Sequence, residues 1–151
     1  MNNSKTTMTT IRIVLFAILL LGMIGSGAEL LLLSHTEDLR QWIPLILLGT
    51  GLLVCAWHGV YLSVLSVRVL QTILLGYILS GFVGMYFHYQ GSAEFKLETN
   101  PSLSGWALFR EAIRAKAPPL LAPGTMVQLG LLGLVYTYRH PALKRVTNKG
   151  A

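Results

Sequence analysis

The sequence has few charged residues and only one cysteine. Only 12% of its 151 residues are Asp, Glu, Lys or Arg, against about 25% in an average soluble domain. The apolar fraction is 53% and the mean hydropathy is +0.59. So little charge fits a surface that faces lipid rather than water. Cys55 lies inside an apolar run, and a single thiol forms neither an internal disulfide nor a Cys-x-x-Cys pair, which argues against thiol–disulfide chemistry.

Spacings typical of catalysis are also missing. The sequence contains no His-x-x-x-His pair and no Glu-x-x-His pair, the ligand spacing of di-iron helix bundles. The net charge of +6 is interpreted as contact with lipid headgroups and as an orientation signal, and no nucleic-acid partner is predicted. These observations argue against an enzyme.

Four apolar runs predict a single transmembrane domain over residues 11–141. The predicted spans are residues 11–33, 42–61, 69–89 and 120–138, and about 20 apolar residues cross a hydrocarbon core of about 30 Å. A polar tail (residues 1–10) precedes them and a basic tail (residues 142–151) follows. The small residues at 25–28 also fit a signal peptide, but the leucines at 30–33 and the later spans favour an uncleaved first span. The predicted fold is an all-α, four-transmembrane-helix bundle.

Residues 90–118 form the predicted segment outside the membrane. A turn at Asn100 and Pro101 begins a helical pattern over residues 103–117. Trp106, Phe109 and Ile113 share one face of this helix, while arginines lie on another. This pattern predicts an extracytoplasmic amphipathic helix that lies on the membrane surface or caps the bundle.

Positive charge predicts the orientation. If both termini lie on one side, that side carries seven Lys or Arg residues against five on the other, where nearly all the acids lie. The positive-inside rule then places both termini in the cytoplasm, in a cell (inner or plasma) membrane. Aromatic residues near the span ends are interpreted as interfacial belts (Trp42, Tyr86, Tyr89 and Trp106 outside; Trp57, Tyr61, Tyr136 and Tyr138 inside).

Gly76, Ser80 and Gly84 recur every fourth residue and leave one face of the third span almost without side chains. In lipid, such a face lets two helices pack backbone to backbone. The neighbouring helix could belong to the same bundle or to another protein, and the sequence leaves both alternatives open.

Two polar side chains inside the predicted spans are candidates for an intramembrane function. Glu29 lies about 10 Å from the midplane of the first span, where a carboxylate needs a partner or water. It either serves as a functional protonatable group or fastens two helices through a hydrogen bond. Gln128, near the midplane of the fourth span, has the same two interpretations: a helix-holding amide or a transport residue.

Imidazole and carboxylate groups near the outer ends of the first and third spans suggest a divalent metal site, although no cofactor is predicted outright. Such groups suit zinc, copper or iron. His58 and His140 would lie at the opposite, inner end, where they are interpreted as structural caps rather than haem ligands. The candidate metal ligands are His35, Glu37, His88, Glu94 and Glu98.

Two functions remain open from the sequence. The first is a non-enzymatic accessory or scaffolding subunit of a larger membrane complex, whose partners are the lipid bilayer and either other membrane subunits or further copies of the chain. The alternative is a small proton-coupled transporter or metal-binding membrane protein that uses Glu29 and the outer His and Glu residues. The layout resembles the small multidrug-resistance transporters in having four short spans and a glutamate in the first. It differs in its 29-residue outer segment, and no function is carried over.

Overall fold

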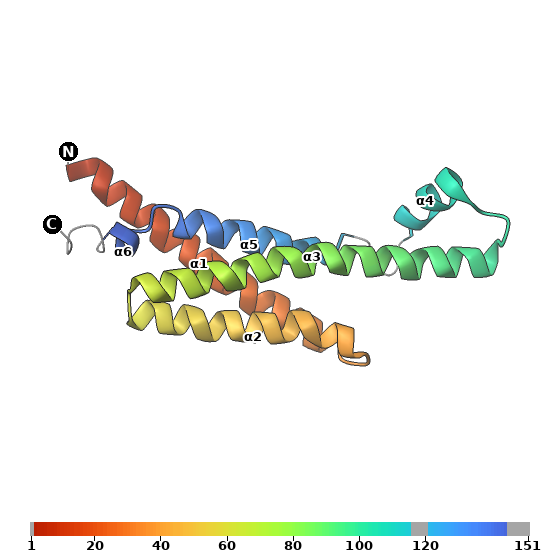
Figure 1. Cartoon of the computed structure of the whole chain (residues 1–151), viewed down its shortest axis with the longest axis horizontal. Helices are drawn as coiled ribbons and strands as arrows, with labels where there is room; N and C mark the ends of the chain where they lie inside the picture. Colours follow the sequence, from red (N-terminus) through yellow and green to blue (C-terminus); the bar gives the residue numbers. More distant parts are fainter. Residues whose placement is uncertain (1, 116–120, 145–151) are drawn as a thin grey trace.

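The computed structural model describes residues 2–115 and 121–144, and within these ranges all regular secondary structure is helical (Figure 1). The helices are α1 (Asn2–Leu32), α2 (Leu39–Val60), α3 (Val64–Thr99), α4 (Gly105–Ile113), α5 (Gly124–Thr137) and α6 (Pro141–Lys144).

Three of these helices, α1, α2 and α3, are long and apolar enough to cross a membrane. Their most apolar 18-residue windows have mean hydropathies of 2.2, 1.8 and 1.6. The all-helical prediction is therefore confirmed, and so is the presence of three long apolar helices.

Two helix ends differ from the prediction. The polar tail of residues 1–10 is helical from Asn2, and the hydroxyls of Thr9 and Thr10 donate to carbonyls four residues earlier. The third helix does not stop at Tyr89 but continues to Thr99. Nothing in residues 90–99 breaks a helix, and α3 ends only at the Asn100 cap, directly before Pro101. The first ten residues of the predicted outer segment therefore extend α3.

The fourth apolar helix is shorter than the predicted span of residues 120–138. α5 has 14 residues and is therefore about 21 Å long, less than the roughly 30 Å of a hydrocarbon core. It begins directly after Pro123, and the first N–H groups of its entry, at Gly124 and Thr125, donate to the carbonyls of Leu121 and Ala122. These turn bonds satisfy the start of the helix within an apolar region. Residue 120 lies outside the described residues.

The helices α1, α2, α3 and α5 pack in a ring, in which each helix contacts the next and α5 returns to α1. α3 lies at the centre of the fold, since it also contacts α4. Tyr77 of α3 fixes α2, because its hydroxyl donates to the Leu47 carbonyl (3.2 Å) in space left by Gly51. The core of the ring consists of fully or nearly fully buried side chains (Leu19, Met23, Leu48, Cys55, Leu70, Leu74 and Tyr77).

Glycines bring α3 and α5 close together. A methyl group added at Gly81 would lie 2.9 Å from the Pro123 carbonyl oxygen, and one added at Gly130 would lie 2.7 Å from the Leu74 carbonyl oxygen. Such distances leave no room for a side chain.

The glycine face predicted at Gly76, Ser80 and Gly84 lies partly in this same interface. Gly84 faces Pro123, where an added methyl would lie 2.8 Å from the proline Cβ. Gly76 faces Leu47 of α2 at an ordinary 3.5 Å, and Ser80 is half-buried. The sequence left open whether this face packs within the bundle or against another protein. In the structure, Gly76 and Gly84 pack against helices of the same bundle.

α4 folds back along the end of α3, and together they form the α3–α4 hairpin (residues 90–113; Figure 1). Lys96 and Glu111 form an ion pair (3.6 Å), Ala112 is fully buried, and the rings of Tyr89 and Phe109 lie 5.8 Å apart. The predicted amphipathic helix is thus present over a shorter range, and it packs on α3.

Candidate functional site

A buried polar network lies where the α2–α3 turn meets the end of α5. Ser63 caps α3, and its hydroxyl accepts from the Ser66 N–H (3.1 Å), while the Ser66 hydroxyl accepts from the Ser63 N–H (3.1 Å). This reciprocal capping fixes Ser66 one turn into α3. The Ser66 hydroxyl then lies 2.8 Å from Nδ1 of His58, at the end of α2. Both side chains are fully buried.

Tyr136 extends the network across the ring of helices to α5. Its hydroxyl lies 2.8 Å from Nε2 of His58. Four aromatic side chains lie together here: Phe16 from α1, His58 from α2, Tyr136 from α5, and His140, which follows α5. Neighbouring centroids lie 5.0 Å (Phe16–Tyr136), 5.2 Å (His58–His140) and 5.5 Å (Tyr136–His140) apart.

Arg12 ties α1 to the end of α5. Its guanidinium donates to the carbonyls of Tyr136 (2.8 Å), Tyr138 (3.0 Å) and Arg139 (3.2 Å). The last carbonyls of a helix have no partner within the helix, and a cation there also complements the helix dipole. An arginine inside the predicted first span therefore has a structural reason to be there.

The hydrogen bonds of this network hold α2, α3 and α5 together. Both His58 nitrogens have hydroxyl partners, so a neutral ring donates through one and accepts through the other. Burial, and then the electrostatic interactions with His58 and Arg12, lower the pKa of His140 to about 4. His140 is therefore neutral at pH 7. Since His58 has no open nitrogen, the network as built joins helices rather than offering a metal ligand.

The sequence interpretation missed this network. His58 and His140 were interpreted as separate caps, and Tyr136 as part of an interfacial belt, yet Tyr136 is only 6% exposed. One signal was available, because Tyr136 lies three residues after Gly133 and six after Gly130, on the packed face of α5. No signal in the sequence joined His58 to Tyr136, 78 residues later.

The two intramembrane candidates lie on the surface of the helix ring. Glu29 is exposed, one turn before the end of α1, and Gln128 is exposed on α5. Neither side chain belongs to the buried core, and their functional roles remain predictions.

The predicted metal ligands are only partly brought together. His35, in the α1–α2 connection, lies near His88: burial first, and then the charge of His88, lower the pKa of His35. Glu37 is exposed in the same connection. Glu94 and Glu98 are exposed further along α3, about 9 Å and 15 Å beyond His88 along the helix axis. Among residues 2–115 and 121–144, no three His, Cys, Asp or Glu side chains group in a way that could hold a metal ion, and the metal site stays a prediction.

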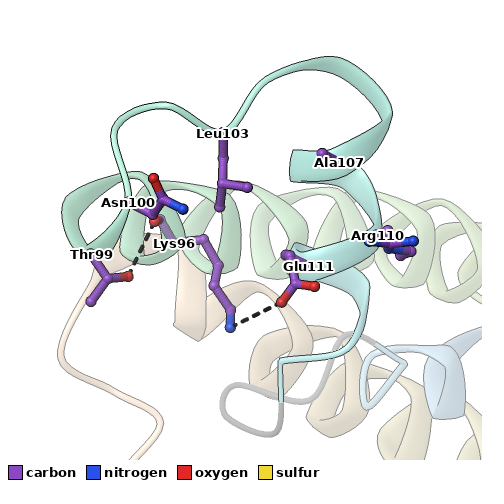
Figure 2. Close-up of a pocket in the computed structure, with 7 residues that line it drawn as sticks. All are labelled: Lys96, Thr99, Asn100, Leu103, Ala107, Arg110 and Glu111. Atoms are coloured by element: carbon purple, nitrogen blue, oxygen red, sulfur yellow. Dashed lines mark hydrogen bonds and ion pairs between the residues drawn. The ribbon is translucent and has the colours of Figure 1, made fainter.

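A shallow pocket of about 330 Å³ opens at the elbow of the α3–α4 hairpin (Figure 2). Figure 2 shows Lys96 reaching from α3 toward Glu111 of α4, so the ion pair joins the two helices among the residues that line the pocket. The lining side chains are mostly polar (Lys96, Thr99, Asn100, Leu103, Ala107, Arg110 and Glu111).

Comparison with protein-family models, with curated proteins and with solved structures finds no match for this chain.

Proposed function

We propose that the protein is a non-enzymatic accessory or scaffolding subunit of a larger membrane complex. In this proposal α1, α2, α3 and the shorter α5 form a four-span bundle in the cell membrane, with both termini in the cytoplasm. The α3–α4 hairpin lies outside the membrane and docks on another subunit.

Exposed aromatic side chains on the α3–α4 hairpin carry this proposal. Trp106 is 73% exposed and Phe95 is 59% exposed. Tyr89 closes the predicted third span, and Lys96 lies about 10 Å further along α3. The Trp106 ring stacks on Phe109 (centroids 5.1 Å apart), and the Phe109 ring lies 5.8 Å from that of Tyr89, so this aromatic group begins where the predicted third span ends. An exposed tryptophan of this kind often anchors a protein interface.

The first test is the composition of the particle that contains this protein after extraction from its own membrane in mild detergent. We expect stoichiometric larger proteins to travel with the wild-type chain. Trp106→Ala should reduce the co-purified partner at least tenfold, because a truncated anchor costs about 2 kcal/mol or more. Tyr61→Ala is the matched control, since Tyr61 is 65% exposed at the opposite end of the bundle. A wild-type particle that contains this chain alone would contradict the proposal.

The nearness of His35 and His88 favours a second candidate, a small proton-coupled transporter or metal-handling protein. In this alternative Glu29 is the protonatable group, and His35, Glu37 and His88 form the core of an ion site. The purified protein should then bind zinc in a way that His88→Ala abolishes, and Glu29→Gln should remove pH-dependent transport while the fold is retained. Equal zinc content in wild type and His88→Ala would exclude the metal site.

A further inference from the structure

Charge is divided between the two ends of the molecule. All six acidic residues of the sequence lie toward the α4 end: in the last turn of α1, the α1–α2 connection, the end of α3, and α4 (Glu29, Glu37, Asp38, Glu94, Glu98 and Glu111). The opposite end, here called the basic end, holds the start of α1, the α2–α3 turn and the end of α5. The cations there whose side chains the structure describes are Lys5, Arg12, Arg68 and Arg139, and no acid lies beside them in the described parts of the chain.

A groove of about 270 Å³ opens at the basic end between α1 and α5. Met8, Ile11, Leu15 and Val135 line it with apolar surface, and Arg12 and Arg139 supply its charge. Ile11 and Val135 are 45% and 60% exposed. The groove therefore continues the apolar outer surface of the helices and ends at two guanidinium groups.

Arg139 is held at this groove by an uncommon backbone conformation. Its φ of +46° lies in the left-handed region, which a residue other than glycine or asparagine rarely adopts. Its guanidinium lies 5.4 Å from the centre of the Tyr138 ring. Among the described residues, no carboxylate forms a salt bridge with it.

Arg12 also has donors to spare. An arginine carries five N–H groups, and three of its hydrogen bonds go to the end of α5. The remaining donors and the Arg139 fork can serve a phosphate, whose oxygens match guanidinium geometry.

We propose that this groove binds one anionic phospholipid. An acyl chain lies along Met8, Ile11, Leu15 and Val135, and the headgroup phosphate is bound by Arg139 together with the free donors of Arg12. The apolar lining calls for a ligand with a hydrocarbon chain, and the absence of acids at this end leaves the arginine charge to be balanced by the ligand. Basic pockets between membrane helices bind anionic headgroups in this way.

The test measures lipid retention by native mass spectrometry on the full-length protein, released from nanodiscs that contain phosphatidylglycerol and phosphatidylcholine in equal amounts. We expect one phosphatidylglycerol per chain, retained about tenfold over phosphatidylcholine. Arg139→Gly should lower this preference about tenfold, the effect of one charge-assisted contact. Because glycine adopts the positive φ without strain, the unfolding temperature of Arg139→Gly in phosphatidylcholine alone should equal or exceed that of wild type, which separates lost binding from misfolding.

Three comparisons complete the test. Arg68→Gln is the matched control, because Arg68 lies at the same end outside the groove and bonds only Gln71 (3.2 Å) among the described residues. An equal loss in Arg68→Gln would show diffuse surface attraction and overturn the site. Val135→Trp should fill the groove and weaken phosphatidylglycerol binding without changing charge, so unchanged binding would exclude the acyl-chain position. Full competition by glycerol phosphate, which has no acyl chain, would identify a free-anion site instead.

Discussion

Gly81→Leu is expected to separate α5 from α3 and to cause one of the two largest losses of stability predicted for this chain. The obstacle to a side chain at Gly81 is backbone, because the Pro123 carbonyl oxygen and the Val127 nitrogen lie 2.9 and 3.0 Å from the position of an added Cβ. Backbone atoms of a helix start cannot rotate aside as a flexible side chain can. We expect a loss of about 3 kcal/mol or more, at the upper end of overpacking effects.

The measurement is thermal unfolding of the detergent-purified protein, followed by size-exclusion monodispersity. Gly49→Leu is the matched control, since Gly49 is also helical but has nothing within 4 Å of an added Cβ. That control should be neutral or slightly stabilising, because leucine is a better helix former than glycine by roughly 0.5–1 kcal/mol. Equal unfolding temperatures for the two variants would mean that α3 and α5 do not approach as closely as described.

His58→Ala is expected to produce the other large loss of stability, through the buried polar network. The change removes a fully buried ring and leaves the hydroxyls of Ser66 and Tyr136 without the partner that each now has at 2.8 Å. Ser66 keeps its hydrogen bonds to Ser63, so the cavity, one lost hydrogen bond and one unsatisfied hydroxyl, that of Tyr136, should together cost about 3–5 kcal/mol. Tyr136→Phe keeps the packing and removes one hydroxyl, so it should cost less, about 1–3 kcal/mol.

The control for His58→Ala is His35→Ala, which removes the same kind of ring from the half-exposed α1–α2 connection and should change stability by no more than about 0.5 kcal/mol. Chemical denaturation in mixed micelles, monitored by far-ultraviolet circular dichroism, gives the ranking of the three variants. Should His58→Ala unfold at the same denaturant concentration as His35→Ala, the network would have no part in joining α2, α3 and α5.

The helices were predictable from the sequence where an unbroken apolar run decides the structure. The first three spans are of this kind, and a long helix covers each of them except for the last residue of the first two, Leu33 and Tyr61. The helix ends were less predictable, because polar residues such as Gln90 and Glu94 can either continue a helix or belong to the loop that follows it. α5 is shorter than its apolar run because the helix begins only after Pro123. The predicted span of residues 120–138 included this proline, which was not recognised as the boundary of the helix.

The candidate site was far less predictable, for a reason of geometry. A hydropathy pattern places a residue at a depth, but it does not choose the neighbour that a side chain meets. Glu29 attracted attention because of its depth and charge, yet its position on the outer surface of α1 depends on where α2 and α5 pack. Conversely, Tyr136 is an aromatic residue near the end of its predicted span, as interfacial residues are. It is buried only because α5 packs closely against α3. The same close packing of α5 on α3 places Gly84 against Pro123.

The hydrogen bonds of Arg12 also bear on the order in which the protein is made. Its acceptors lie 124 to 127 residues later in the chain, so a ribosome must add more than a hundred residues after Arg12 before the first of them exists. During that time water is an alternative partner for the Arg12 guanidinium, and His58 likewise meets Tyr136 only after another 78 residues have been added. The basic end of the bundle is therefore completed only once α5 has been made, and a chain interrupted before α5 would leave the Arg12 guanidinium without its three carbonyl acceptors.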